Sequence, residues 1–224
     1  MKDKNNHGIT LDMKYSGTLS NIKSLLVFTP QATKKLRAVT GWNRFDYPRN
    51  RVEMGGWLIG NYIFNDEGKV IQAEVTDILH ATDCKGTPTY LEWPAKEDIR
   101  LQREFFRMKD ELTARNPSKG EKLSRIGWWH THPNSLPVFM SSTDMETQRS
   151  KYFRDHDFSV VLNPHRMIWK AFAGRNAEEV PAIMLFGKPD SEKAKKHKKA
   201  KKNWKKKKMC TRRRRNSRKN NGRK

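Results

Sequence analysis

The sequence predicts an α/β protein with one mixed, largely antiparallel sheet flanked by helices, followed by a disordered basic tail. Segments with strand-like composition are interspersed with segments whose apolar residues have helical spacing. A polar turn joins two long β-rich runs, and basic residues gather at the C-terminal end. A chain of 224 residues that is 35% apolar fits one ordinary domain and an unstructured segment.

The first predicted elements are a helix and a β-hairpin. Residues 30–42 have apolar side chains at helical spacing, with Thr29 suited to the N-cap and a proline at the first helical position. Two β-rich runs follow at 51–64 and 70–81, joined by the polar turn 65–68, which ends in glycine. We expect these two strands to pair antiparallel.

A second helix is predicted over residues 94–114, where charged residues occupy one side of an amphipathic pattern. The Asn-Pro-Ser-Lys-Gly sequence at 116–120 should end it. The residues expected near its apolar face are Ile99, Phe105 or Phe106, Met108 and Leu112.

The remaining predicted elements complete the domain. A short strand is expected over 123–131, then a helix from about 142 to 153. Further strands are expected near 158–163, 167–173 and 180–186. No internal repeat is visible, so the pattern predicts one α/β domain.

The charge of the chain divides it into three parts: an N-terminal extension (1–22), a folded domain (23–187) and a basic tail (188–224). The tail has a net charge of +18 out of the total of +23, which leaves only +5 for residues 1–187. It contains almost no apolar residues, so it cannot offset the entropy of ordering and should be disordered.

Two interpretations of the tail remain open. It can bind DNA, RNA or an acidic partner by neutralising phosphates, or it can be a solubilising or localising extension without a defined partner. The residues that would contact nucleic acid are Lys205, Lys206, Lys207, Arg212, Arg213 and Arg214.

Cysteine content and hydropathy indicate the cellular compartment in which the protein is expected. The two cysteines, Cys84 and Cys210, cannot form a disulfide framework, which is typical of a reducing environment. The N-terminal segment has no apolar core of signal-peptide length, and no run approaches the roughly 18 apolar residues of a membrane span. We therefore expect a cytoplasmic protein that does not bind membranes.

The stretch 128–148 contains the residues with the clearest chemistry. His130 and His132 are two apart on a predicted strand, so both imidazoles face the same side, roughly 7 Å apart at the backbone. Asp144 lies in the first turn of a helix that Ser141 or Ser142 can cap. Two histidines and a carboxylate leave a fourth zinc position for water, as in catalytic zinc sites.

A zinc hydrolase also needs a general base, and Glu53 is the candidate. It stands at the start of the run VEMGGWLIG, which is otherwise apolar and rich in glycine. Burying a carboxylate among such residues is costly, so its presence there suggests a function. Each feature has an ordinary explanation by itself. A His-x-His pair is more often surface or core histidine, a glutamate that opens a strand is usually solvated, and a serine before a helix is a cap.

Taken in order, these residues resemble the JAMM motif of the JAB/MPN metalloprotease family: a Glu, then His-Ser/Thr-His-Pro, then Ser-x-x-Asp. The matching residues here are Glu53, 130–133 and 141–144, and the resemblance extends over approximately residues 26–186. The loop 133–140 has eight residues, one more than the family usually has between the second histidine and the serine. We expect the site geometry to be kept, because the extra residue falls in a proline-containing loop.

The resemblance implies a zinc-dependent isopeptidase or peptidase of the smaller, prokaryotic kind, with an MPN/JAB-like domain. His130, His132 and Asp144 would bind one Zn²⁺ per chain, and Glu53 would act as general base for the zinc-bound water. Ser141 would help hold the oxyanion that develops at the carbonyl. Active family members cleave the amide bond after the C-terminus of ubiquitin or a ubiquitin-like protein, so such a protein or its conjugate is the expected partner.

Two other functions remain open. The domain can be a catalytically weak scaffold whose basic tail binds nucleic acid, since some family members have lost their metal ligands. It can also hydrolyse a different small amide at the same site. Retention of the complete motif favours the isopeptidase.

Overall fold

The computed structural model describes residues 25–44, 46 and 48–186. The predicted extension 1–22 and the basic tail 188–224, with its six candidate nucleic-acid contacts, lie outside the described residues. Among the described helices, none combines the length and the apolar character that crossing a bilayer requires.

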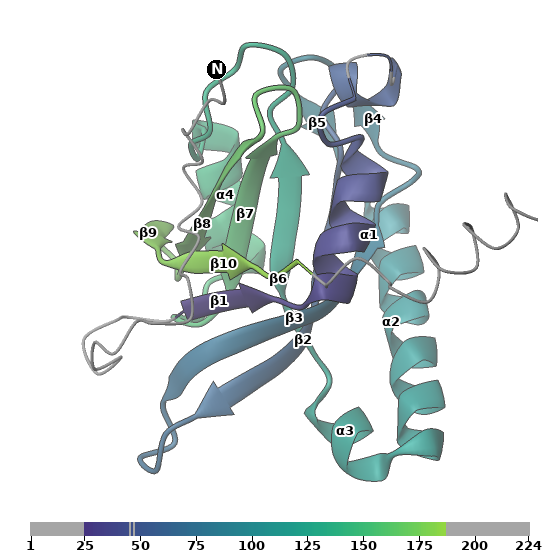
Figure 1. The fold of residues 1–224 in the computed structure, drawn as a ribbon, viewed down its shortest axis with the longest axis vertical. Coiled ribbons are helices and arrows are strands. Elements are labelled where there is room, and N and C mark those ends of the chain that lie inside the picture. The colour runs from purple at the N-terminus through teal and green to yellow at the C-terminus, as the bar shows by residue number, and fades with distance from the viewer. Residues whose placement is uncertain (1–24, 45, 47, 187–224) are drawn as a thin grey trace, which may run out of the picture. The chain divides into compact units, whose positions relative to one another are not determined.

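Eight strands of the described chain form one sheet, in the order β10-β1-β3-β2-β6-β7-β8-β9 (Figure 1). The strands are β1 (Leu25–Phe28), β2 (Gly55–Phe64), β3 (Val70–His80), β6 (Ser124–Thr131), β7 (Phe158–Asn163), β8 (Ile168–Ala173), β9 (Glu178–Val180) and β10 (Ala182–Met184). Two further short strands, β4 (Lys85–Gly86) and β5 (Leu91–Glu92), pair only with each other. The helices are α1 (Pro30–Thr40), α2 (Ala95–Arg115), α3 (Pro117–Lys122) and α4 (Ser142–Lys151), with one 3-10 turn, η2 (Pro48–Arg51).

The sheet is mixed. The pairs β2–β3, β2–β6, β7–β8 and β8–β9 are antiparallel, whereas β1–β10, β1–β3 and β6–β7 are parallel. The expected fold class, a mixed and largely antiparallel sheet flanked by helices, is confirmed.

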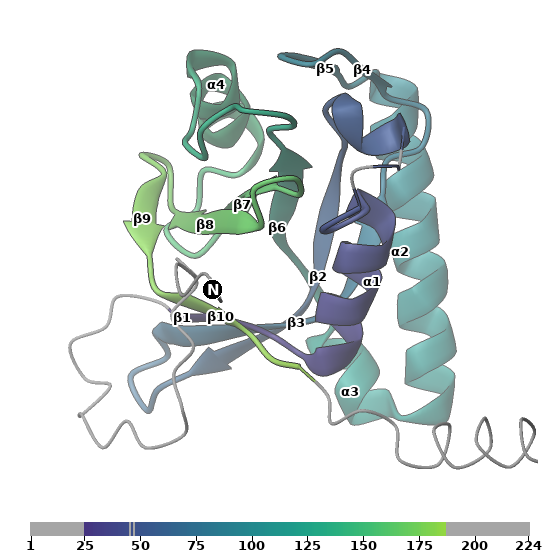
Figure 2. The ribbon, with the colours of Figure 1, turned by 45° about the horizontal axis from the view of Figure 1, so that its top comes forward.

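The strand expected over 180–186 is shorter, since β10 covers only residues 182–184, and Val180 instead ends β9 at the opposite edge of the sheet. β9 pairs with β8 and β10 pairs with β1, and only Pro181 separates them. Proline has no N–H to donate to a neighbouring strand, so the pairing of β9 with β8 ends at Pro181. The chain then continues into β10 at the opposite edge of the sheet. The carbonyl of Pro181 still accepts a hydrogen bond from the Leu26 amide. The sheet must therefore curve until its two ends lie one residue apart (Figure 2).

Helices cover both faces of the central strands. Leu58 packs with Leu36 of α1 in one apolar cluster, whereas its neighbours Trp57 and Ile59 pack with Leu101 of α2 in another. This alternation is the period-2 pattern of a strand buried on both faces. Figure 2 shows α1 and α2 beside the same strands.

The apolar face of α2 is made by Leu101 with Phe105, Met108 and Leu112. The expected member Ile99 is wrong, because its side chain is 51% exposed. Positions 101, 105, 108 and 112 follow the i, i+4, i+7, i+11 spacing of one helical stripe, and position 99 falls outside that stripe. Helix α2 itself lies within one residue of the predicted bounds.

Several short elements differ from the prediction. The strand expected to begin at residue 51 begins at Gly55, because residues 48–51 form the 3-10 turn. The sequence 117–122, which was expected only to break a helix, forms α3. β1 and the β4–β5 pair were not foreseen.

Candidate metal centre

Strand β6 carries His130 near its end, and His132 follows the strand directly. The strand lies between β2 and β7, and Trp128 is paired with Trp57. Since Trp57 faces α2, the alternate residues Trp128 and His130 face the same side. Both imidazoles are buried, with His130 1% and His132 4% exposed. The strand therefore holds His130, and the hydrogen bond from the His132 amide to the Leu162 carbonyl (2.8 Å) holds the backbone of His132 against β7.

Asp144 reaches the histidines from the first turn of α4. The Asp144 amide donates a hydrogen bond to Ser141 Oγ (3.2 Å), and the Ser141 amide donates to Asp144 Oδ2 (2.8 Å). This reciprocal pair is a capping box, in which the side chain at the third helical position returns to the cap. The carboxylate is held by its own helix, and Ser141 is the cap.

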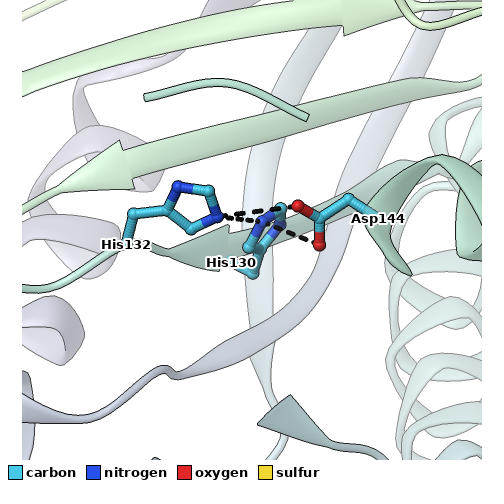
Figure 3. Close-up of side chains that lie close together, drawn as sticks. All are labelled: His130, His132 and Asp144. Carbon is cyan, nitrogen blue, oxygen red and sulfur yellow. Dashed lines mark hydrogen bonds and ion pairs between the residues drawn. The ribbon is translucent and has the colours of Figure 1, made fainter. Parts of the chain in front are cut away.

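His130, His132 and Asp144 converge on one point (Figure 3). The Nε2 atoms of the two histidines are 3.2 Å apart, and Asp144 Oδ1 is 3.2 Å from His130 Nε2. Asp144 Oδ2 is 3.6 Å from His132 Nε2. Tetrahedral zinc with ligands at 2.0–2.1 Å has edges of roughly 3.3–3.4 Å. The donor types and their separations fit a zinc ion.

Hydrogen bonds outside this group fix the orientation of His132. Its Nδ1 is 2.8 Å from the carbonyl oxygen of Pro137. A carbonyl can only accept, so Nδ1 carries the proton and the Nε2 lone pair of the neutral ring points at the other ligands. Such an outward hydrogen bond is typical of histidines that bind metals.

Burial and the contacts among its own members set the ionisation of this group. Burial acts to raise the pKa of Asp144, but the hydrogen bonds with His130 and His132 outweigh it and hold that pKa well below its ordinary value. Burial acts to lower the pKa of His132, but the hydrogen bonds with Asp144 and the Pro137 carbonyl, together with the charges of Asp144 and Glu53, outweigh it and raise that pKa. The carboxylate is therefore ionised at neutral pH.

Glu53 is brought to the same place by backbone contacts. Thr131, the residue between the histidines, donates its amide to the Met54 carbonyl (2.8 Å) and accepts the Met54 amide at Oγ1 (2.9 Å). The Glu53 amide donates to the Thr87 carbonyl (2.8 Å), next to β4. The 55–64 strand therefore enters the sheet with Glu53 beside the histidine pair.

A cavity of about 340 Å³ contains all five residues of the sequence motif: Glu53, His130, His132, Ser141 and Asp144. Burial raises the pKa of Glu53 from 4.5 to about 7, with the charge of His132 lowering it and that of Asp144 raising it further. The Glu53 carboxyl can thus gain or lose a proton near neutral pH.

The sequence indicated the loop 133–140 and Trp128 as a candidate groove wall, but not Tyr90, Leu91, Trp93 or Tyr152. Aromatic and aliphatic side chains line the cavity, namely Tyr90, Leu91, Trp93, Trp128, Leu136, Phe139 and Tyr152. Its polar end contains the ion pair between Asp98 of α2 and Lys151 of α4, 2.7 Å long. The aromatic residues at 90 and 93 beside a turn were the available signal, but their position opposite 139 depends on the fold.

Comparison with known proteins agrees with the site. No protein-family model matches the chain. The chain is 27% identical over 121 residues to COP9 signalosome complex subunit 5 of Candida glabrata, a JAB/MPN protein. The match covers 51% of this chain and 23% of that protein. The similarity supports the JAB/MPN family.

Proposed function

We propose that the chain is a zinc-dependent isopeptidase or peptidase of the JAB/MPN type, of the smaller prokaryotic kind. Its substrate would be the amide bond after the C-terminus of ubiquitin or a ubiquitin-like protein. The observation that supports this most is that Glu53 shares one cavity with the His130, His132 and Asp144 group. The similarity to a signalosome subunit supports the same family.

His130, His132 and Asp144 would hold the ion. A zinc ion bound there supplies a Lewis acid and lowers the pKa of water to about 7. Glu53, whose pKa burial raises to about 7, is suited to accept a proton from the attacking water at its carboxylate and to deliver it to the leaving amine.

Ser141 has a second task in this proposal. Its Oγ accepts the Asp144 amide as a helix cap, which leaves the hydroxyl hydrogen able to donate. Ser141 also lines the cavity, so it is suited to donate to the oxyanion that develops when a carbonyl is attacked. Its cap and its proposed donor roles use different atoms.

The test combines zinc content with hydrolysis in the full-length protein. We expect about one zinc per chain, much less in His132→Ala and Asp144→Ala, and cleavage of ubiquitin-like fusion proteins. Glu53→Gln should keep zinc and lose 10²–10⁴-fold in rate. Glu67→Gln, an exposed residue in the 65–68 turn, is the matched control.

Contrary results have distinct meanings. Zinc binding without cleavage of fusions or of a panel of small amides would favour the scaffold function. Cleavage of small amides alone would favour a different amide hydrolase. A folded protein that binds no zinc would exclude both the zinc isopeptidase and the small-amide hydrolase.

The concentrated charge of residues 188–224 favours a second candidate role, binding of nucleic acid or another polyanion. The affinity of this segment for the polyanion should fall steeply with added salt, because phosphate neutralisation releases counterions. Absence of binding at low salt would leave the tail as an extension without such a partner.

A further inference from the structure

The eight-residue loop 133–140 runs from His132 toward α4, and its first half is held by hydrogen bonds. Asn163, fully buried at the end of β7, donates its side-chain amide to the carbonyls of Asn134 (3.0 Å) and Leu136 (2.8 Å). Asn134 has a left-handed backbone, with φ of 58°, which asparagine tolerates better than most residues. The next carbonyl, that of Pro137, accepts the hydrogen bond from His132.

His165 completes this contact from the turn between β7 and β8. Its Nδ1 lies 2.8 Å from the Asn134 amide nitrogen, and its Nε2 lies 2.8 Å from Asn50 Oδ1. Asn50 is fully buried, and its Nδ2 donates to the carbonyls of Gly41 (3.1 Å) and Arg44 (2.8 Å). One imidazole therefore links the loop to the segment that precedes Glu53.

The partners of His165 leave one arrangement of protons. A backbone amide can only donate, so Nδ1 accepts from Asn134 and has no proton. The side-chain nitrogen of Asn50 faces two carbonyls, so its oxygen faces the ring and Nε2 donates to it. Burial and the nearby charge of Arg51 lower the pKa of His165, which agrees with a neutral ring.

We propose that His165 is a positioning residue for the metal centre. It anchors the loop 133–140 through the Asn134 amide, and so holds the Pro137 carbonyl that orients His132. The inference rests on the proposed metal centre. It predicts that the acceptor at Nδ1, rather than the bulk of the ring or its link to Asn50, is what the centre needs.

Two conservative variants separate the two ends of the ring. In His165→Asn the side-chain oxygen lies as many bonds from the backbone as Nδ1, so the acceptor for Asn134 is kept. In His165→Gln the amide nitrogen takes the place of Nε2, so only the donor to Asn50 is kept. His165→Ala removes both. His156→Ala, which removes a half-buried histidine packed against Tyr62, is the matched control.

The full-length variants are compared by hydrogen exchange of metal-free protein over residues 133–140 and by zinc affinity in competition with a chelator. His165→Ala and His165→Gln should exchange faster in this loop and bind zinc about 10–100-fold more weakly. His165→Asn and His156→Ala should resemble the parent in both measurements. Thermal unfolding identifies any variant whose domain no longer folds.

Other results overturn the inference. Unchanged loop exchange and zinc affinity in His165→Ala would show that the ring positions nothing. Rescue by glutamine and not by asparagine would assign the effect to Asn50. A parent that binds no zinc would overturn the metal centre, whereas loop exchange in metal-free protein still decides whether His165 anchors the loop.

Discussion

Trp128 donates a hydrogen bond from Nε1 to Gln148 Oε1 across 2.8 Å, and its ring stacks on His130 with the centroids 4.6 Å apart. Gln148 is fully buried on α4, one turn after Asp144. Its Nε2 lies within hydrogen-bonding distance of the carbonyls of Tyr152 (2.8 Å) and Gly174 (3.1 Å). This glutamine therefore connects α4, which carries Asp144, to β6, which carries His130.

Replacement of Gln148 by leucine should lower the free energy of unfolding by about 2–4 kcal/mol, because it leaves the Trp128 N–H and buried carbonyls without partners. Zinc affinity should fall as well, since α4 is less firmly placed. Urea unfolding measures the first effect. The control is Gln102→Leu on the exposed side of α2, which should change stability by no more than about 0.5 kcal/mol. Equal stability of the two variants would contradict the prediction.

Zinc should stabilise the folded protein through Asp144. Binding to the folded state alone contributes about 2.7 kcal/mol at a free concentration of 100 Kd. We expect added zinc to raise the melting temperature of the parent and a chelator to lower it, with no shift in Asp144→Asn. Asparagine retains an oxygen for the helix cap, so the variant should fold. Asp155→Asn, at an exposed site, should respond like the parent, and a missing response in both variants would point to another site.

Replacing Ser141 separates its two roles. Glycine at an N-cap costs only a few tenths of a kcal/mol, whereas alanine costs about 1 kcal/mol. Ser141→Gly should therefore keep nearly full stability while hydrolysis slows by about 10²–10³-fold, the usual loss for one oxyanion donor. Thermal unfolding and steady-state kinetics provide the two measurements. An unchanged rate in Ser141→Gly would leave the serine as a cap alone.

Glu97 should make stability depend on pH. This fully buried carboxylate at the start of α2 accepts the Thr82 amide (2.7 Å) and the Arg100 guanidinium (2.6 Å), which also reaches the His80 carbonyl. Burial acts to raise the pKa of Glu97, but the hydrogen bonds, chiefly from Arg100, outweigh it and hold the pKa below 4.5. A lowered folded-state pKa contributes stability above the unfolded pKa and loses it as pH falls through the folded value.

Glu97→Gln should therefore cost roughly 2–3 kcal/mol at pH 7, less than for a wholly buried pair because Arg100 is partly exposed. The difference from the parent should shrink below about pH 4. Urea unfolding at a series of pH values checks it, with the exposed Glu121→Gln as control. A difference that persists unchanged at low pH would show that the carboxylate charge is not responsible.

The parts of this fold that local sequence determines were predicted well. Thr29 and Pro30 begin α1 as expected, and the turn 65–68 joins the hairpin. The spacing of His130 and His132 placed both on one face, and Ser141 caps the helix that carries Asp144. Each of these follows from interactions between residues close together in the chain.

The parts that were not predicted depend on distant contacts. Glu53 was expected at the site, but the contacts of Thr131 and Thr87 with the backbone around it, which bring it to the cavity, follow from no local pattern. Strand β1 is four apolar residues whose partners lie far along the chain. The sequence could have placed Gln148 on the same face of the helix as Asp144, which it follows by one turn. Nothing in the sequence shows that it binds Trp128.

The one-residue link at Pro181 limits how the domain can move. Because β9 and β10 are bonded to opposite ends of the sheet, the sheet cannot unroll without breaking either the β8–β9 or the β1–β10 ladder. The curvature of the sheet is thereby constrained, and His130, near the end of β6, keeps its place within it. The segments outside the sheet that line the cavity include parts of residues 85–92, the loop 133–140 and α4, so we expect changes in the width of the cavity to come from them. Engineering of substrate access should begin with those three segments.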